Sequence, residues 1–143
     1  MKVLAYNIKV FVYGTLLRGI HNHDYYLKDS NFVKEDSLPK FEMRTHGSYP
    51  GIRPLKWNRA ISKVHGEVFE INEETLKRLD QLEGVAPPER VSKDYTGNYT
   101  RETVKTESGE EVFVYVKCNC KEQMRMVVRD GRWKTFVQKH RRF

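Results

Sequence analysis

The sequence predicts a single α+β domain with an antiparallel sheet, and three observations favour this class. The chain has 143 residues, enough for one sizeable core and too few for two ordinary domains. Short β-branched and aromatic runs outnumber the helical segments. Short turns join these runs, whereas a parallel sheet would need long crossover connections. We therefore expect one domain over residues 1–143, ending in a basic segment, 121–143.

The N-terminal third carries strand and turn signals. The run from Ile8 to Tyr13 is rich in β-branched and aromatic residues and stops at a glycine, which predicts a central strand. Residues 31–45 alternate loosely around Pro39, which predicts two short strands or one that bends at a sheet edge. Two prolines and a glycine in residues 49–54 predict a stiff connecting loop.

The middle of the chain predicts a strand followed by a helix. Residues 64–71 favour a strand, and Gly66 within it indicates a bulge or the close approach of another group. A helix is expected over residues 73–83, because Asn72 suits its N-cap and Gly84 ends it. Its apolar residues recur at three-residue spacing, namely Leu76, Leu79 and Leu82.

A hairpin is expected next, with strands over residues 99–107 and 111–117 and a turn at Ser108 and Gly109. Its second strand places three valines on one face, at positions Val112, Val114 and Val116.

The positive charge is concentrated near the C-terminus. The formal net charge is +7, yet residues 1–120 carry 18 Lys and Arg against 17 Asp and Glu. Residues 121–143 carry 8 against 2. A basic terminal segment can contact phosphates, but it is more often a solvated surface, so we do not expect a nucleic-acid partner.

No pattern indicates a metal, cofactor or membrane site. Cys118 and Cys120 lie one residue apart with no second pair at zinc-finger spacing, so we expect free thiols and no metal. No stretch approaches the roughly 20 apolar residues that cross a bilayer, and the first residues do not resemble a signal peptide. We expect a cytoplasmic protein without a cofactor.

The most informative motif follows the first strand. Residues 13–19 form a loop bracketed by Gly14 and Gly19, with the Thr15 hydroxyl beside it. Backbone N–H groups in such a loop can bind an anion or an oxyanion. The same pattern also suits a tight turn in which the glycines serve geometry alone.

Glu83 stands at the end of the predicted helix. The negative end of the helix dipole and the nearby Asp80 both disfavour its carboxylate, so we expect a raised pKa. A carboxyl with a pKa near neutral can accept and return a proton. If the side chain is exposed, Glu83 merely marks the helix end.

These motifs occur together in one order along most of the domain. They are Tyr13 to Leu16, Pro50 to Ile52, His65 to Val68, Leu79 to Gly84 and Tyr99 to Arg101. The set resembles the gamma-glutamylcyclotransferase-like family over roughly residues 10–117. Asn22 and His23 make the gamma-glutamylamine cyclotransferase branch the most similar.

The resemblance implies a fold, a reaction and site residues. The fold would be a small antiparallel β-barrel flanked by helices. Family members release 5-oxoproline from small gamma-glutamyl substrates. By the matching motifs, Tyr13, Gly14, Thr15 and Leu16 would bind the gamma-glutamyl group, and Glu83 would be the catalytic acid/base.

Four other residues are weaker candidates. Arg18 and Arg53 lie beside the candidate loops and could pair with a substrate α-carboxylate. Trp133 stands where relatives often have an aromatic residue that closes the pocket. His65 suits either a general base or a half-buried histidine with satisfied hydrogen bonds.

The residue types suit an intramolecular ring closure that needs no metal. The substrate α-amine attacks its own γ-carbonyl, so the enzyme folds the substrate, accepts a proton and stabilises an oxyanion. The leaving amine stays open, with gamma-glutamyl-ε-lysine or a protected biosynthetic intermediate as examples. A non-catalytic binding module that uses residues 121–143 to contact an acidic partner or nucleic acid is the alternative.

Overall fold

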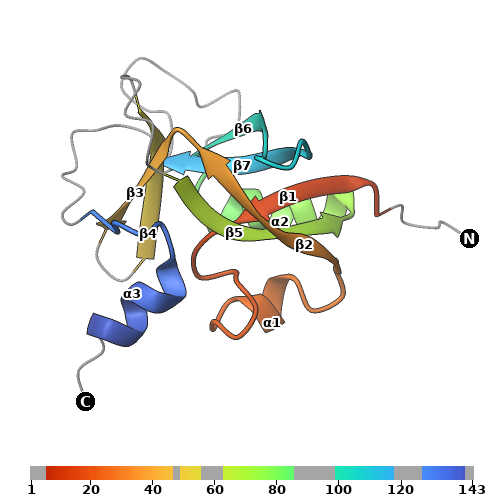
Figure 1. Ribbon diagram of the computed structural model, residues 1–143. Coiled ribbons are helices and arrows are strands. Elements are labelled where there is room, and N and C mark those ends of the chain that lie inside the picture. The colour runs from red at the N-terminus through yellow and green to blue at the C-terminus, as the bar shows by residue number, and fades with distance from the viewer. Residues whose placement is uncertain (1–5, 47–48, 56–62, 86–98, 118–126, 141–143) are drawn as a thin grey trace, which may run out of the picture.

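The computed structural model describes residues 6–46, 49–55, 63–85, 99–117 and 127–140. Within these ranges the chain forms seven strands and three helices, which confirms the α+β class (Figure 1). In chain order they are β1 (Ile8–Val12), α1 (His23–Tyr26), β2 (Asn31–Pro39), β3 (Phe41–His46), β4 (Tyr49–Pro54), β5 (Lys63–Ile71), α2 (Glu73–Leu82), β6 (Tyr99–Lys105), β7 (Glu111–Lys117) and α3 (Trp133–His140).

Strand β1 lies at the centre of a five-stranded sheet of order β2-β5-β1-β7-β6. It pairs antiparallel with β5, where Val10 faces Phe69, and parallel with β7, where Val10 faces Phe113. The side chains of Val10, Phe11 and Val12 are at most 3% exposed, because both faces of the strand are covered. The predicted central strand is confirmed.

The sheet differs from the expected closed antiparallel barrel. The β1–β7 pair is parallel, and the described edge strands β2 and β6 are not paired with each other. Polar contacts join β2 to the turn after β6 instead: the Glu107 amide donates to the Ser37 carbonyl at 2.8 Å, and the Ser108 hydroxyl donates to Asp36 at 2.6 Å. The described sheet is therefore open, and polar contacts alone link its two edges.

Residues 49–54 form strand β4 and not the expected loop. The strand pairs antiparallel with β3 in a second, two-stranded sheet. Pro50 and Pro54 are four residues apart and so face the same way, while the Leu55 amide donates to the Lys40 carbonyl at 2.9 Å. Both prolines therefore occupy non-hydrogen-bonded positions of the β3–β4 pair, where the strand residue does not donate a main-chain hydrogen bond to its partner. A strand tolerates proline at such positions.

Helix α2 begins where the sequence predicts and ends at Leu82, one residue before the predicted end. The Asn72 side chain accepts a hydrogen bond from the Thr75 amide at 2.8 Å, and Leu79 is fully buried against the sheet. Glu83 is the C-cap, and Gly84 follows with a φ of 65°. The β6–β7 hairpin is also confirmed, with Gly109 in its turn at a φ of 96°.

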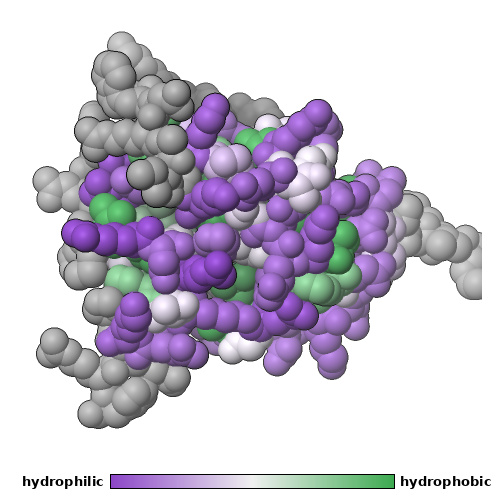
Figure 2. All heavy atoms as spheres, viewed as in Figure 1, coloured by the Kyte–Doolittle hydropathy of each residue, from purple (hydrophilic) through white to green (hydrophobic). Residues whose placement is uncertain are grey.

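Helix α3 shows that part of the basic segment contributes to the core. Trp133 is only 4% exposed, and Phe136 and Val137 pack against the core cluster. Cys118 and Cys120 lie outside the described residues. Figure 2 shows a mostly hydrophilic face with small, separate hydrophobic areas. No described helix is long and apolar enough to cross a membrane.

Candidate active site

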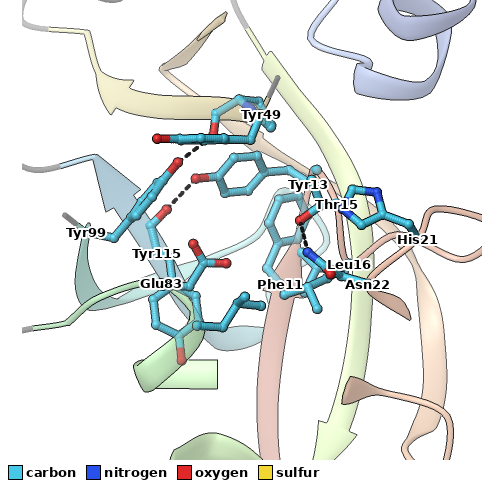
Figure 3. Close-up of a pocket in the computed structure, with 14 residues that line it drawn as sticks. Phe11, Tyr13, Thr15, Leu16, His21, Asn22, Tyr49, Glu83, Tyr99 and Tyr115 are labelled. Atoms are coloured by element: carbon cyan, nitrogen blue, oxygen red, sulfur yellow. Dashed lines mark hydrogen bonds between the residues drawn. The ribbon is translucent and has the colours of Figure 1, made fainter. Parts of the chain in front are cut away.

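A cavity of about 310 Å³ opens where the loop after β1 meets β4, the end of α2 and the β6–β7 hairpin. Its lining includes all five residues that the sequence motifs nominate: Tyr13, Gly14, Thr15, Leu16 and Glu83. Figure 3 shows Glu83 on one side of this space and Thr15 with Leu16 on another. Segments far apart in the sequence thus meet around one volume large enough for a small substrate.

The loop after β1 is shaped by a turn and by close packing. The Leu17 amide donates to the Gly14 carbonyl at 3.1 Å, and the side chains of Leu16 and Leu17 are buried. A Cβ on Gly14 would lie 2.5 Å from Cγ of Pro50, so only glycine permits this contact. Glycine is therefore needed at position 14 because the loop packs closely against β4.

Hydrogen-bond donors of this loop remain available to a ligand. The amides of Thr15 and Leu16 donate to no other residue that the structure describes. Thr15 is only partly buried, and its hydroxyl accepts a hydrogen bond from Asn22. A loop that leaves main-chain N–H groups beside a cavity offers sites for an anionic oxygen.

Three tyrosines form an aromatic wall beside Glu83. The Tyr13 hydroxyl donates to the Tyr115 carbonyl at 2.6 Å, and the Tyr99 hydroxyl donates to the Pro50 carbonyl at 2.8 Å. The Tyr115 hydroxyl donates to Asp80 at 2.7 Å. Burial, as the largest cause, raises the pKa of all three phenols above their usual range, so they stay neutral.

The carboxyl of Glu83 lies partly buried and points into the cavity (Figure 3). It forms no hydrogen bond or ion pair with another described residue, while its main-chain amide donates to the Leu79 carbonyl. Burial raises its pKa from 4.5 to about 7, and the positive charge of Lys117 opposes this rise. At neutral pH such a carboxyl is poised between its two protonation states.

The expected direction of this pKa shift is confirmed, and its largest cause is burial of the carboxyl, which the sequence did not predict. Asp80 forms an ion pair with Arg101 at 2.5 Å and accepts a hydrogen bond from Tyr115. A neighbouring cation therefore compensates the charge of Asp80. The aromatic surroundings of Glu83 disfavour its charged form.

The weaker candidates Arg18, Arg53, His65 and Trp133 are not among the lining of this cavity. Arg18 binds Glu67, with its side-chain Nε 3.2 Å from Oε2, and Arg53 pairs with Glu42 at 3.2 Å. Arginine pairing with a substrate carboxylate is therefore not supported for either residue. His65 and Trp133 belong to a separate depression between β5 and α3, so the expectation that Trp133 closes the pocket is wrong.

Several cavity residues were given no site role from the sequence, although Pro50 and Tyr99 belong to the motifs that carry the family resemblance. Tyr99 and Tyr115 reach the cavity because β6 and β7 pair beside β1. Tyr49 and Pro50 do so through the unexpected strand β4. Asn22 lines the cavity too, although in the sequence it marked only a resemblance to one branch.

A model of the family described as gamma-glutamyl cyclotransferase, AIG2-like, matches residues 10–135. The chain belongs to this family. A protein of Vibrio cholerae provisionally named gamma-glutamylcyclotransferase is 31% identical over 125 residues, which cover 87% of this chain and 93% of that protein. The family resemblance expected from the motifs is therefore confirmed.

Other relatives match over shorter regions. A protein of Methanocaldococcus jannaschii with the same provisional name is 47% identical over 77 residues, which cover 52% of this chain and 60% of that protein. The gamma-L-glutamyl-butirosin B gamma-glutamyl cyclotransferase of Niallia circulans is 39% identical over 74 residues. That match covers 52% of this chain and 44% of the relative.

A solved structure supports the fold. The crystal structure of an uncharacterized protein from Pyrococcus horikoshii superimposes with a TM-score of 0.71 at 24% sequence identity. The alignment covers 94% of this chain and 96% of that one.

Proposed function

We propose that the protein is a gamma-glutamyl cyclotransferase that converts a gamma-glutamyl amine into 5-oxoproline and a free amine. One observation carries the proposal: the Glu83 carboxyl, with a pKa of about 7, faces the Tyr13–Leu16 loop across a single cavity. The reaction needs a proton acceptor and an oxyanion site at opposite sides of a folded substrate. Family membership supports the same reaction type.

The first step is activation of the substrate amine. The α-ammonium group loses a proton to the Glu83 carboxylate and becomes a nucleophile. The amine then attacks the γ-carbonyl carbon of its own molecule, which forms the ring C–N bond and places negative charge on the carbonyl oxygen. The tethered nucleophile avoids the entropy cost of a second reactant, which can lower the barrier by several kcal/mol.

The second step is release of the leaving amine. We assign stabilisation of the oxyanion to the amides of Thr15 and Leu16, which donate to no other described residue. Glu83 returns its proton to the leaving nitrogen as the old C–N bond breaks. A second proton follows the same route from the ring nitrogen, so the two protons lost by the α-ammonium group are those that the amine gains.

The leaving group is an amine without an acidic group near the reacting bond. The described lining contains four tyrosines, Tyr13, Tyr49, Tyr99 and Tyr115, and no Lys or Arg. A leaving group with its own carboxylate would meet no cation among these residues, whereas an alkyl or cationic amine can pack against aromatic rings. The named butirosin relative also supports release of an amine.

The test is 5-oxoproline release, measured by mass spectrometry, from a panel of gamma-glutamyl amines, amino acids and dipeptides. Wild type is compared with Glu83→Gln, which keeps the shape of the side chain and removes the titrating carboxyl. Glu73→Gln is the matched control, because Glu73 is exposed in the first turn of the same helix.

We expect release from at least one gamma-glutamyl amine by wild type and Glu73→Gln. In Glu83→Gln the rate should fall by about 10²–10⁴, the usual contribution of general acid–base catalysis. Full activity of Glu83→Gln would remove Glu83 from the reaction. No release from any compound by folded wild type would overturn the proposed function.

A further inference from the structure

The side chain of Asn22 occupies a helix N-cap position but does not cap the helix. Asn22 precedes α1, where an asparagine commonly accepts a hydrogen bond from a main-chain amide of the first turn. No such side-chain bond forms here. Its Nδ2 donates instead to Oγ1 of Thr15 at 2.9 Å, on the cavity side of the loop (Figure 3).

This side-chain bond is not needed to hold the path of the chain. The main-chain amide of Asn22 already donates to the Thr15 carbonyl at 3.1 Å, and the His23 amide donates to the Ile20 carbonyl at 3.0 Å. The two residues are thus joined twice, once through the main chain and once through the side chains. The main-chain bond remains when the Asn22 side chain is truncated.

The bond determines what the Thr15 hydroxyl can do. A threonine hydroxyl has one proton to donate and two lone pairs that accept. Because a lone pair of Oγ1 receives the Asn22 amide, the hydroxyl proton is directed elsewhere, and no described residue accepts it. Both Thr15 and Asn22 line the cavity that contains Glu83.

We propose that Asn22 is a positioning residue that holds the Thr15 hydroxyl as a hydrogen-bond donor toward a negatively charged oxygen of the gamma-glutamyl substrate. The inference rests on the proposed function. Two substrate groups carry such charge: the α-carboxylate throughout the reaction, and the oxyanion derived from the γ-carbonyl in the transition state. Both lie within a few bonds of the amine that reacts at Glu83.

The test is a double-mutant cycle on 5-oxoproline release with Asn22→Ala, Thr15→Val and the double variant. Valine keeps the shape of threonine and removes its hydroxyl. We expect Thr15→Val and Asn22→Ala each to lower kcat/KM by about tenfold, the value of roughly one hydrogen bond. The double variant should be no worse than Thr15→Val, because Asn22 acts only through the hydroxyl.

The split between kinetic constants identifies the oxygen. A rise in KM at constant kcat assigns the bond to the α-carboxylate, since that group is charged before and during the reaction. A fall in kcat at constant KM assigns it to the oxyanion, which exists only in the transition state. Either result supports the role of Asn22.

Asn22→Asp provides a second, independent variant. A carboxylate only accepts hydrogen bonds, so it would take the Thr15 proton and turn the donor away from the substrate. We expect its kcat/KM to fall at least as far as that of Asn22→Ala. The new carboxylate also repels a negatively charged substrate directly. This repulsion is the same when Asn22→Asp is combined with Thr15→Val, so comparing the effect of Asn22→Asp with and without Thr15→Val separates the repulsion from the effect on the hydroxyl.

Two results would overturn the inference. One is a double variant whose loss equals the product of the two single losses, and the other is wild-type activity in Asn22→Asp. Thermal unfolding of each variant shows whether a loss of activity comes from a loss of stability. We expect the variants to stay folded, because the main-chain bond between Asn22 and Thr15 is retained. If wild type is active and the losses multiply, this inference fails alone, whereas an inactive wild type removes the proposed function.

Discussion

Replacing Glu83 with glutamine should stabilise the protein at alkaline pH and leave its stability unchanged in acid. The folded state raises the pKa of this carboxyl from 4.5 to about 7. Between these values the folded protein keeps a proton that the unfolded chain has lost. The free energy of unfolding of the wild type therefore falls as the pH rises from 4.5 through 7, and it levels off above that range.

The size of the effect follows from the two pKa values. Each pKa unit corresponds to about 1.36 kcal/mol, so the rise from 4.5 to about 7 sets an upper limit of about 3 kcal/mol. Glu83 is only partly buried, and water reduces the energy at its open side. We expect Glu83→Gln to be more stable than wild type by about 2 kcal/mol at pH 8.

Urea unfolding of wild type, Glu83→Gln and the control Glu73→Gln at pH 4.5, 6 and 8 measures this difference. The advantage of Glu83→Gln should grow with pH, while Glu73→Gln should follow the wild type, because its side chain is exposed. A difference that does not change with pH would refute the reasoning. So would a wild type that is more stable than Glu83→Gln at pH 8.

Three further substitutions test the parts that surround Glu83. Gly14→Ala places a Cβ 2.5 Å from Cγ of Pro50, so the loop or β4 must shift, and kcat/KM for 5-oxoproline release should fall more than tenfold; full activity would contradict this. Glu67→Gln weakens its contacts to the main-chain amide and side chain of Arg18, which hold the end of the loop that lines the cavity, so KM should rise severalfold with the pH dependence of kcat unchanged; an unchanged KM would contradict this. Tyr99→Phe removes the hydrogen bond to the Pro50 carbonyl, and urea unfolding should show a loss of about 1 kcal/mol, whereas an unchanged midpoint would show that water replaces the bond.

Elements with local signals could be predicted from the sequence. Helix α2 has an asparagine whose side chain caps its first turn and a glycine at positive φ after its last residue. The strand that became β1 is an apolar run followed by a glycine turn, as expected of a strand buried on both faces. In each case a few neighbouring residues carry the information.

Elements that depend on distant partners could not be predicted in the same way. Residues 49–54 read as a loop because of their prolines, and only the antiparallel pairing with β3 makes them a strand. The short helix α1 has no buried residue to create a periodic pattern. Helix α3 lies in a segment whose charge masks the apolar side chains of Trp133 and Phe136.

The residues of the candidate site also fall into a group with local sequence motifs and a group that depends on distant contacts. The Tyr13–Leu16 loop and Glu83 carry recognisable local motifs, and the cavity brings them together. Their catalytic and binding roles remain proposals. The aromatic wall arises from strand order, since Tyr115 reaches Tyr13 only because β7 pairs with β1. The use of the Asn22 side chain depends on a contact seven residues away across a turn.

The most direct test of the account measures three products of one gamma-glutamyl amine in the same sample: 5-oxoproline, free glutamate and the released amine. Mass spectrometry follows the reaction with wild type and with Glu83→Gln. We expect equal amounts of 5-oxoproline and amine from the wild type, no glutamate, and almost no product from Glu83→Gln. Glutamate in place of 5-oxoproline would show attack by water, and undiminished 5-oxoproline from Glu83→Gln would show that another group moves the proton.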